Sequence, residues 1–176
     1  CHYRWHYEEN LDAASKRFAK LFVPKAVQKV FGLRTVILNK ASKTFKQRMS
    51  KRLWVIGSNE VTGISIEESF KNLIRLLDKH LERRPYIFGN RPSIADFALW
   101  GHIYNANNDV TANEFIQKHT PKLNDWIDRM IDPKEQGGFE EWHQLKPTLL
   151  PLIKEEISEM FLPWVTANND AVKNNK

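Results

Sequence analysis

The chain has 176 residues, of which 41% are hydrophobic and 11% aromatic, enough for one domain with a sizeable core. This composition excludes a disordered chain, and only 7 Gly and 8 Pro favour long regular elements over a turn-rich β fold. The single cysteine, Cys1, excludes an internal disulfide framework and a cysteine-based metal site. No run of apolar residues is long enough for a membrane-spanning helix, and a cytoplasmic location is expected.

The net charge of +6 is distributed unevenly along the chain. Residues 1–63 contain 13 Lys and Arg against 4 Asp and Glu, whereas the remainder contains 14 against 17. The excess is greatest over residues 40–52, at Lys40, Lys43, Lys46, Arg48, Lys51 and Arg52. Such a segment binds an anion or nucleic acid, or else forms the solvated face of a helix or a face opposite an acidic partner. No aromatic stacking platform accompanies the charges, so a nucleic-acid partner is not expected.

Apolar residues recur with helical spacing along the first half of the chain. The first stripe consists of Leu11, Ala14, Phe18, Leu21 and Phe22. The second consists of Leu33, Ile37, Ala41, Phe45, Met49 and Leu53. The third consists of Phe70, Leu73, Ile74, Leu77 and Leu81. Residues 36–38 and 53–56 are the best strand candidates, but both adjoin helical stripes, and we expect helix at both. Loops are predicted over residues 57–64 and 132–141.

Local signals predict where several helices begin and end. Ser65 and Glu68 have the spacing of a capping box. Thr120 followed by Pro121 predicts an N-cap and the first residue of a helix. The last third of the chain is predicted to be broken into shorter pieces by Pro147, Pro151 and Pro163. We expect one domain of about six to eight helices over residues 1–172, with a polar tail at 173–176.

The most informative passage covers residues 84–100, with the sequence RPYIFGNRPSIADFALW. A helix is predicted to end at its start, and Gly89 and Asn90 suit a tight turn. Ser93 and Asp96 form a Ser-x-x-Asp capping box, in which the Asp96 carboxylate bonds back to the Ser93 backbone. Loss of this carboxylate is expected to cost about 1–2 kcal/mol. The helix that follows is apolar on nearly all sides, so we expect it to be central, with other helices packed around it.

This passage, extended through GHI, resembles the signature of the glutathione transferase C-terminal domain, in which a Gly-x-x-Pro-Ser/Thr-x-Ala-Asp turn opens the central helix. Residues 121–130, PKLNDWIDRM, resemble a later helix of the family with the form P-x-L-x-x-W-x-x-R-M. Residues 148–152 and 161–168 are similar to C-terminal extensions of some bacterial members. The resemblance implies an all-α fold, the helical bundle of the glutathione transferase C-terminal domain.

The resemblance also implies that two domains have separate roles. In this family a thioredoxin-like domain binds glutathione and supplies the Tyr, Ser or Cys that activates its thiol, while the helical domain lines the pocket for an apolar electrophile. No thioredoxin-like pattern is recognisable here, and the chain starts with Cys rather than Met, so a longer protein is expected. Glutathione would be the co-substrate of that protein, with no cofactor and no catalytic residue in this chain. The partners implied are the N-terminal thioredoxin-like domain and a second copy in a homodimer, but no membrane.

The first helix of such a domain faces the glutathione-binding domain. This implies pocket residues at the start of the chain, where aromatic rings with polar tips suit an apolar wall: Tyr3, Arg4, Trp5 and Tyr7. The alternative is that these side chains only fill the seam between two domains. His102 and Tyr104 follow the start of the central helix and are further pocket candidates, although a single histidine is more often a hydrogen-bonded core residue.

Two other features of the first 63 residues bear on function. His2 and His6 are spaced as metal ligands on a helix can be, but no third ligand accompanies them, and no metal site is expected. Helical domains of this family also act as non-catalytic docking modules for a protein or RNA partner. The basic first 63 residues would suit such an acidic partner.

Overall fold

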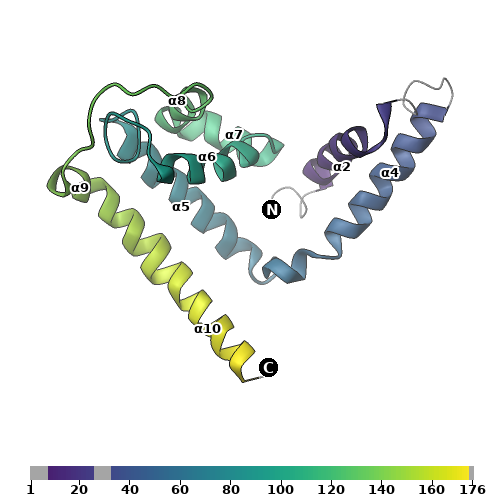
Figure 1. Cartoon of the computed structure of the whole chain (residues 1–176). Coiled ribbons are helices and arrows are strands. Elements are labelled where there is room, and N and C mark those ends of the chain that lie inside the picture. Colours follow the sequence, from purple (N-terminus) through teal and green to yellow (C-terminus); the bar gives the residue numbers. More distant parts are fainter. Residues whose placement is uncertain (1–7, 26–32, 175–176) are drawn as a thin grey trace. The chain divides into compact units, whose positions relative to one another are not determined.

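The computed structural model describes residues 8–25 and 33–174, and Figure 1 shows its ribbon. In chain order the elements are α2 (Glu8–Phe22), α4 (Leu33–Ser50), the 3₁₀ helix η1 (Leu53–Ile56), α5 (Gly63–Leu81), α6 (Ile94–Ala106), α7 (Val110–His119), α8 (Pro121–Arg129), α9 (Trp142–Leu152), the π-helix η2 (Ile153–Phe161) and α10 (Leu162–Lys173). Over the described ranges the elements are all helices, with isolated β-bridges that join Gly89 to Tyr86 and to Phe139. The predicted all-α fold is confirmed, as is helix at both strand candidates.

The chain divides into two compact units. The first consists of Cys1–Glu67 with Tyr104–Glu114, and the second of Glu68–Ile103 with Phe115–Lys176. The boundary therefore passes through α5, α6 and α7. The single domain over residues 1–172 stays a prediction. Among the described residues, no helix has both the length and the apolar character that crossing a membrane requires.

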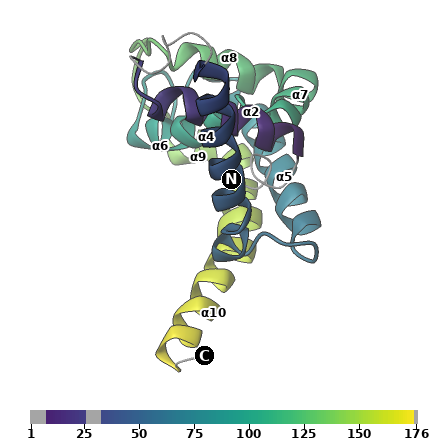
Figure 2. The same ribbon diagram turned by 90° about the vertical axis from the view of Figure 1, so that its right-hand side faces the viewer.

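In the first unit, α2 packs against α4, as both ribbon views show (Figure 2). Its core is formed by the predicted stripes of the two helices and η1, through Leu11, Ala14, Phe18, Met49 and Leu53. Aromatic rings extend this contact, since the Phe45 ring centroid lies 5.5 Å from that of Phe22. The first stripe ends earlier than predicted, because the side chain of Leu21 is 78% exposed.

The start of α5 differs from the prediction. The helix begins at Gly63, so Ser65 lies inside its first turn and does not cap it. The preceding turn is instead closed by Asn59, whose Oδ1 accepts hydrogen bonds from the backbone N–H groups of Val61 (2.8 Å) and Thr62 (3.0 Å). Asparagine side chains commonly close turns in this way, and here that turn decides where the helix starts.

In the second unit, the predicted stripe of α5 forms the base of the main core. Its buried side chains Ile74, Leu77 and Leu81 meet residues of α6, α7, α8 and α9. Trp126 of α8 is fully buried at this meeting point. Within its own unit, α6 packs on one face only: Asp96 and Ile103 are buried, but the side chain of Ile94 on the opposite face is 87% exposed. The expected packing around all sides of this helix is therefore not found within the unit.

The last third of the chain is one continuous helical rod rather than the predicted short pieces. It runs through α9, η2 and α10, with Pro147 and Pro151 inside α9 and Pro163 in the first turn of α10 (Figure 1). Proline removes a helix hydrogen bond and clashes with the preceding turn. The backbone adopts the wider π form two residues after Pro151, over Ile153–Phe161, and the helix continues without a break.

The rod is also held from the side. The Ser69 hydroxyl of α5 donates to Glu156 (2.6 Å), and the Asn72 amide donates to Glu155 (2.9 Å) and Glu156 (2.8 Å). These bonds connect α5 to the start of η2 and supply tertiary stabilisation next to the prolines. The prediction of helix breaks failed because it counted the lost backbone bonds and omitted these side-chain bonds.

Candidate functional site

Asp96 is the centre of the buried polar structure in the second unit. Its side chain is fully buried and accepts four hydrogen bonds. Oδ2 accepts from the Ser93 backbone N–H (2.9 Å) and the Ser93 hydroxyl (2.6 Å), which is the geometry of the predicted box. Oδ1 accepts from the Ile87 N–H (2.8 Å) and from Nε1 of Trp126 (3.0 Å). One carboxylate therefore connects the start of α6, the preceding turn and α8.

The turn before α6 depends on Gly89. Its φ is +126°, a backbone conformation that residues with a side chain rarely adopt. A Cβ placed there would lie 2.8 Å from the backbone nitrogen of Glu140 and 3.0 Å from the carbonyl oxygen of Gly138. The close approach allows Glu140 N–H to donate to the Phe88 carbonyl (2.8 Å), so the turn and the loop before α9 bond to each other.

Helix α8 begins at Pro121 as predicted, but a different side chain caps it. The Thr120 hydroxyl donates backward to the Ile116 carbonyl of α7 (2.9 Å) and makes no cap bond. The cap comes from α5, where Asp78 Oδ1 accepts from the Leu123 N–H (2.9 Å). This arrangement satisfies a free N–H at the helix start from a neighbouring helix.

A second buried network surrounds His80 of α5. Nε2 donates to the Ile87 carbonyl (2.7 Å), while Nδ1 faces the Thr148 hydroxyl (2.8 Å) and Nη1 of Arg84 (3.1 Å). Burial lowers the pKa of His80 from its ordinary value, and the nearby Arg84 charge lowers it further. Arg84 in turn pairs with Glu140 at 3.0 Å. The ring is thus held neutral by its surroundings and acts as a structural bridge between α5 and α9.

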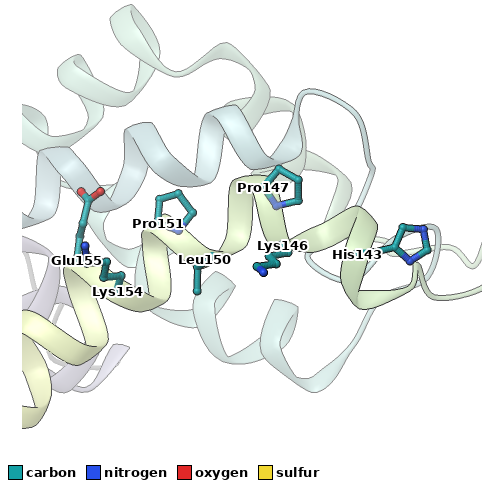
Figure 3. Close-up of a pocket in the computed structure, with 7 residues that line it drawn as sticks. All are labelled: His143, Lys146, Pro147, Leu150, Pro151, Lys154 and Glu155. Carbon is teal, nitrogen blue, oxygen red and sulfur yellow. The ribbon is translucent and has the colours of Figure 1, made fainter.

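A hollow in the second unit lies along the rod. Its volume is about 460 Å³, and Figure 3 shows its lining residues spaced along α9 and the start of η2: His143, Lys146, Pro147, Leu150, Pro151, Lys154 and Glu155. Two proline rings and the half-exposed Leu150 supply apolar surface. Lysine side chains stand beside them, so the hollow suits an apolar ligand that carries a negative group.

This hollow has the character of a binding surface. Among its lining residues, the Glu155 carboxylate accepts a hydrogen bond from Asn72 (2.9 Å) and so contributes to holding the rod. No serine, threonine, cysteine or tyrosine lines it, so the hollow lacks a side-chain hydroxyl or thiol for nucleophilic catalysis.

The pocket residues expected from the sequence are only partly described by the structure. Tyr3, Arg4, Trp5 and Tyr7 lie outside the described residues, as do His2 and His6. His102 and Tyr104 lie on α6 and are both exposed. Two residues apart on a helix they point about 200° away from each other, so they do not line one wall of α6 together.

Comparison with known protein families decides the relationship. The family model described as glutathione S-transferase, C-terminal domain matches residues 37–129, a little over half of the chain. The chain belongs to this family. Comparisons with curated proteins and with solved structures give no match. The family match includes the capping box and all of α8, so the hydrogen bond between Asp96 and Trp126 lies within the part of the chain that matches the glutathione S-transferase family.

The roles of several residues at these sites could not be predicted from the sequence. Asp78 and Arg84 act on segments 45 and 56 residues further along the chain, at Leu123 and Glu140. Two prolines line the hollow, and proline in a sequence predicts a helix break. The spacing of Pro147, Leu150 and Pro151 on one helical face was the signal available.

Proposed function

We propose that this chain is the substrate-binding helical half of a glutathione transferase that conjugates glutathione to apolar electrophiles. The observation that carries the proposal is the family match together with the capping-box turn that opens α6. The glutathione thiol would be activated by a thioredoxin-like domain joined to this chain. A cytoplasmic location, a role in detoxification and assembly as a homodimer belong to the same proposal.

The described residues support a binding role for this half. The hollow on α9 combines apolar surface with lysines, which suits an apolar electrophile whose glutathione conjugate is anionic. The buried polar groups around Asp96 and His80 are engaged in hydrogen bonds within the fold. They hold the helices in place and are not proposed as catalytic residues.

The test uses the intact protein with any thioredoxin-like domain that precedes this chain. It is expected to bind to immobilised glutathione and to conjugate chlorodinitrobenzene, and this chain alone is expected to do neither. Leu150→Asp should raise the KM for the electrophile and leave the KM for glutathione unchanged. Leu162→Asp is the matched control, because this leucine is 50% exposed against 40% for Leu150 and lies on α10 outside the hollow. Absence of both glutathione binding and conjugation in the intact protein would reject the proposal.

His102 and Tyr104 are tested in the same assay. If either side chain lines the electrophile pocket, its alanine variant raises the KM for the electrophile selectively. Asn105→Ala, also exposed on α6, is the control. Equal KM values in all three variants would remove both residues from the proposed pocket.

A second candidate function is supported by the surface of the rod. An apolar stripe with helical spacing, formed by Ile157, Met160, Phe161 and Trp164, is 41–58% exposed. Exposed apolar stripes of this kind mark protein contacts, and no cation interrupts this one as an RNA-binding surface would require. A non-catalytic docking module for a protein partner is therefore the alternative. It is favoured if the intact protein fails in both glutathione assays while Trp164→Ala abolishes a partner interaction.

A further inference from the structure

A cleft between α2 and α4 concentrates positive charge in the first unit. Its volume is about 190 Å³, and its lining residues are Lys16, Lys20, Arg34, Thr35, Leu38 and Asn39. Lys16 and Lys20 lie one turn apart on α2, and the other four lie in the first two turns of α4. Because α2 packs directly on α4, both walls belong to one compact unit.

The lining of this cleft contains three cations and no acidic residue. Asp12, one turn before Lys16 on α2, forms its ion pair at 2.8 Å with Lys46, which does not line the cleft, and it also attracts Lys16 electrostatically. Like charges brought together on a folded surface repel each other and reduce its stability. An anion in the cleft would reverse this effect, so the charge distribution favours a negatively charged ligand.

The other groups that line the cleft also favour a negatively charged ligand. The Thr35 hydroxyl and the Asn39 amide add hydrogen-bond donors beside the cations. Arg34 lies in the first turn of α4, where the helix dipole is positive and no acidic residue is present. A cation at that end of a helix is unfavourable by itself but strengthens the attraction for an anion.

We propose that this cleft binds a small ligand through a phosphate group or a similar oxyanion. Arg34 can bind two oxygens of such a group at once, and the two lysines act as point charges. The cleft is smaller than the 300–1,000 Å³ typical of whole-ligand pockets, so it holds one charged group. None of its lining side chains is aromatic, so it offers no surface for stacking a nucleic-acid base. This site lies in the first unit and does not depend on the function proposed for the second.

Pyrophosphate is the probe for the test, titrated into the full chain by calorimetry and by thermal unfolding. It is expected to bind, to raise the midpoint of unfolding and to shift the backbone amide resonances of Thr35 and Asn39. The double variant Lys16→Gln/Arg34→Gln should lose at least about tenfold in affinity, as expected for removal of two charged contacts. The matched control is Lys43→Gln, which removes an exposed cation of α4 outside the cleft and should stay within about twofold of the wild type.

Three results would overturn the proposal. The first is no binding of pyrophosphate, and the second is an equal loss in Lys43→Gln, which would indicate a diffuse basic surface. The third is tight binding of single-stranded RNA that pyrophosphate does not displace, which would make the surface a nucleic-acid site.

Without ligand, the double variant should unfold at the wild-type temperature or above it, because repulsion between the cations is reduced. If it does not fold, Lys16→Gln alone, at an exposed position, is expected to lose about fivefold and decides the question in the same titration.

Discussion

Nε1 of Trp126 donates a hydrogen bond of 3.0 Å to Oδ1 of Asp96, across 30 residues of chain. The two residues belong to the two sequence segments that resemble the glutathione transferase C-terminal domain. The residue pattern of each segment can be explained by its own helix, because one segment opens α6 and the other forms α8. The hydrogen bond shows that they also form one structural unit, because a single buried carboxylate satisfies donors from both.

Replacing Asp96 is therefore expected to cost more than the loss of a helix cap. Asp96→Ala leaves the Ile87 N–H and the Trp126 indole N–H buried without an acceptor, and should lower the free energy of unfolding by about 3–4 kcal/mol. Ser93→Ala removes only the hydroxyl and should cost about 1 kcal/mol. Urea unfolding of both variants measures the difference, and equal losses would contradict the central position of Asp96.

The two glycines Gly89 and Gly101 are expected to respond to alanine in opposite directions. At Gly89 the positive φ and the 2.8 Å approach of Glu140 N leave no room, so Gly89→Ala should destabilise the protein by about 2 kcal/mol or more. Gly101 lies inside α6, and nothing lies within 4 Å of its added Cβ. Gly101→Ala should therefore stabilise by about 0.5–1 kcal/mol. Thermal unfolding of the pair tests both signs against the wild type.

The cap that reaches α8 from α5 gives a third prediction. Asp78→Ala removes the acceptor for the Leu123 N–H and should cost about 1–2 kcal/mol, while Asp78→Asn keeps an oxygen there and should cost less. Asp125→Ala removes an exposed carboxylate of α8 that lies 3.6 Å from Lys122, and should change stability by less than about 0.5 kcal/mol. If the two alanine variants unfold at the same urea concentration, the cap contributes nothing.

The neutral His80 ring gives a pH dependence with a defined sign. Its folded pKa is lowered by burial, whereas the unfolded ring titrates near its ordinary value of about 6.5. As the pH falls below about 6.5, the unfolded chain binds a proton that the folded chain does not, so stability decreases. The charged groups that act on the ring are Arg84, which lowers its pKa, and Glu140 and Asp96, which raise it.

Unfolding free energies measured between about pH 5 and pH 8 test this dependence. His80→Gln should be less stable overall because the bridge to Ile87 and Thr148 is altered. The difference between the wild type and this variant should shrink as the pH falls, since only the wild type loses the contribution of the ring. A difference that is constant with pH would show that His80 does not titrate between the two states.

The sequence was sufficient for features that depend on neighbouring residues. The helical stripe of α5, the box of Ser93 with Asp96 and the start of α8 at Pro121 all follow from spacings of three or four residues. It was not sufficient where a distant residue decides the outcome. Thr120 has the type and position of a cap, yet Asp78 occupies that role because α5 passes beside the start of α8.

The C-terminal rod illustrates the same limit for helix breaks. Pro147 and Pro151 each remove a backbone hydrogen bond, and local reasoning predicts short pieces. The bonds from Ser69 and Asn72 to Glu155 and Glu156 lie 83 to 87 residues apart along the chain. The hollow on α9 exists because the prolines remain inside a helix, so it was missed for the same reason.

The hydrogen bonds from Ser69 and Asn72 attach the rod to α5 near the start of η2. No side chain of η2 or α10 is buried. The segment after Phe161 therefore contributes little to the folding of the core. A dye, an affinity tag or a surface linker attached to α10 would lie outside the core and would not disturb its packing. For engineering, the exposed face of α10 is the natural point of attachment.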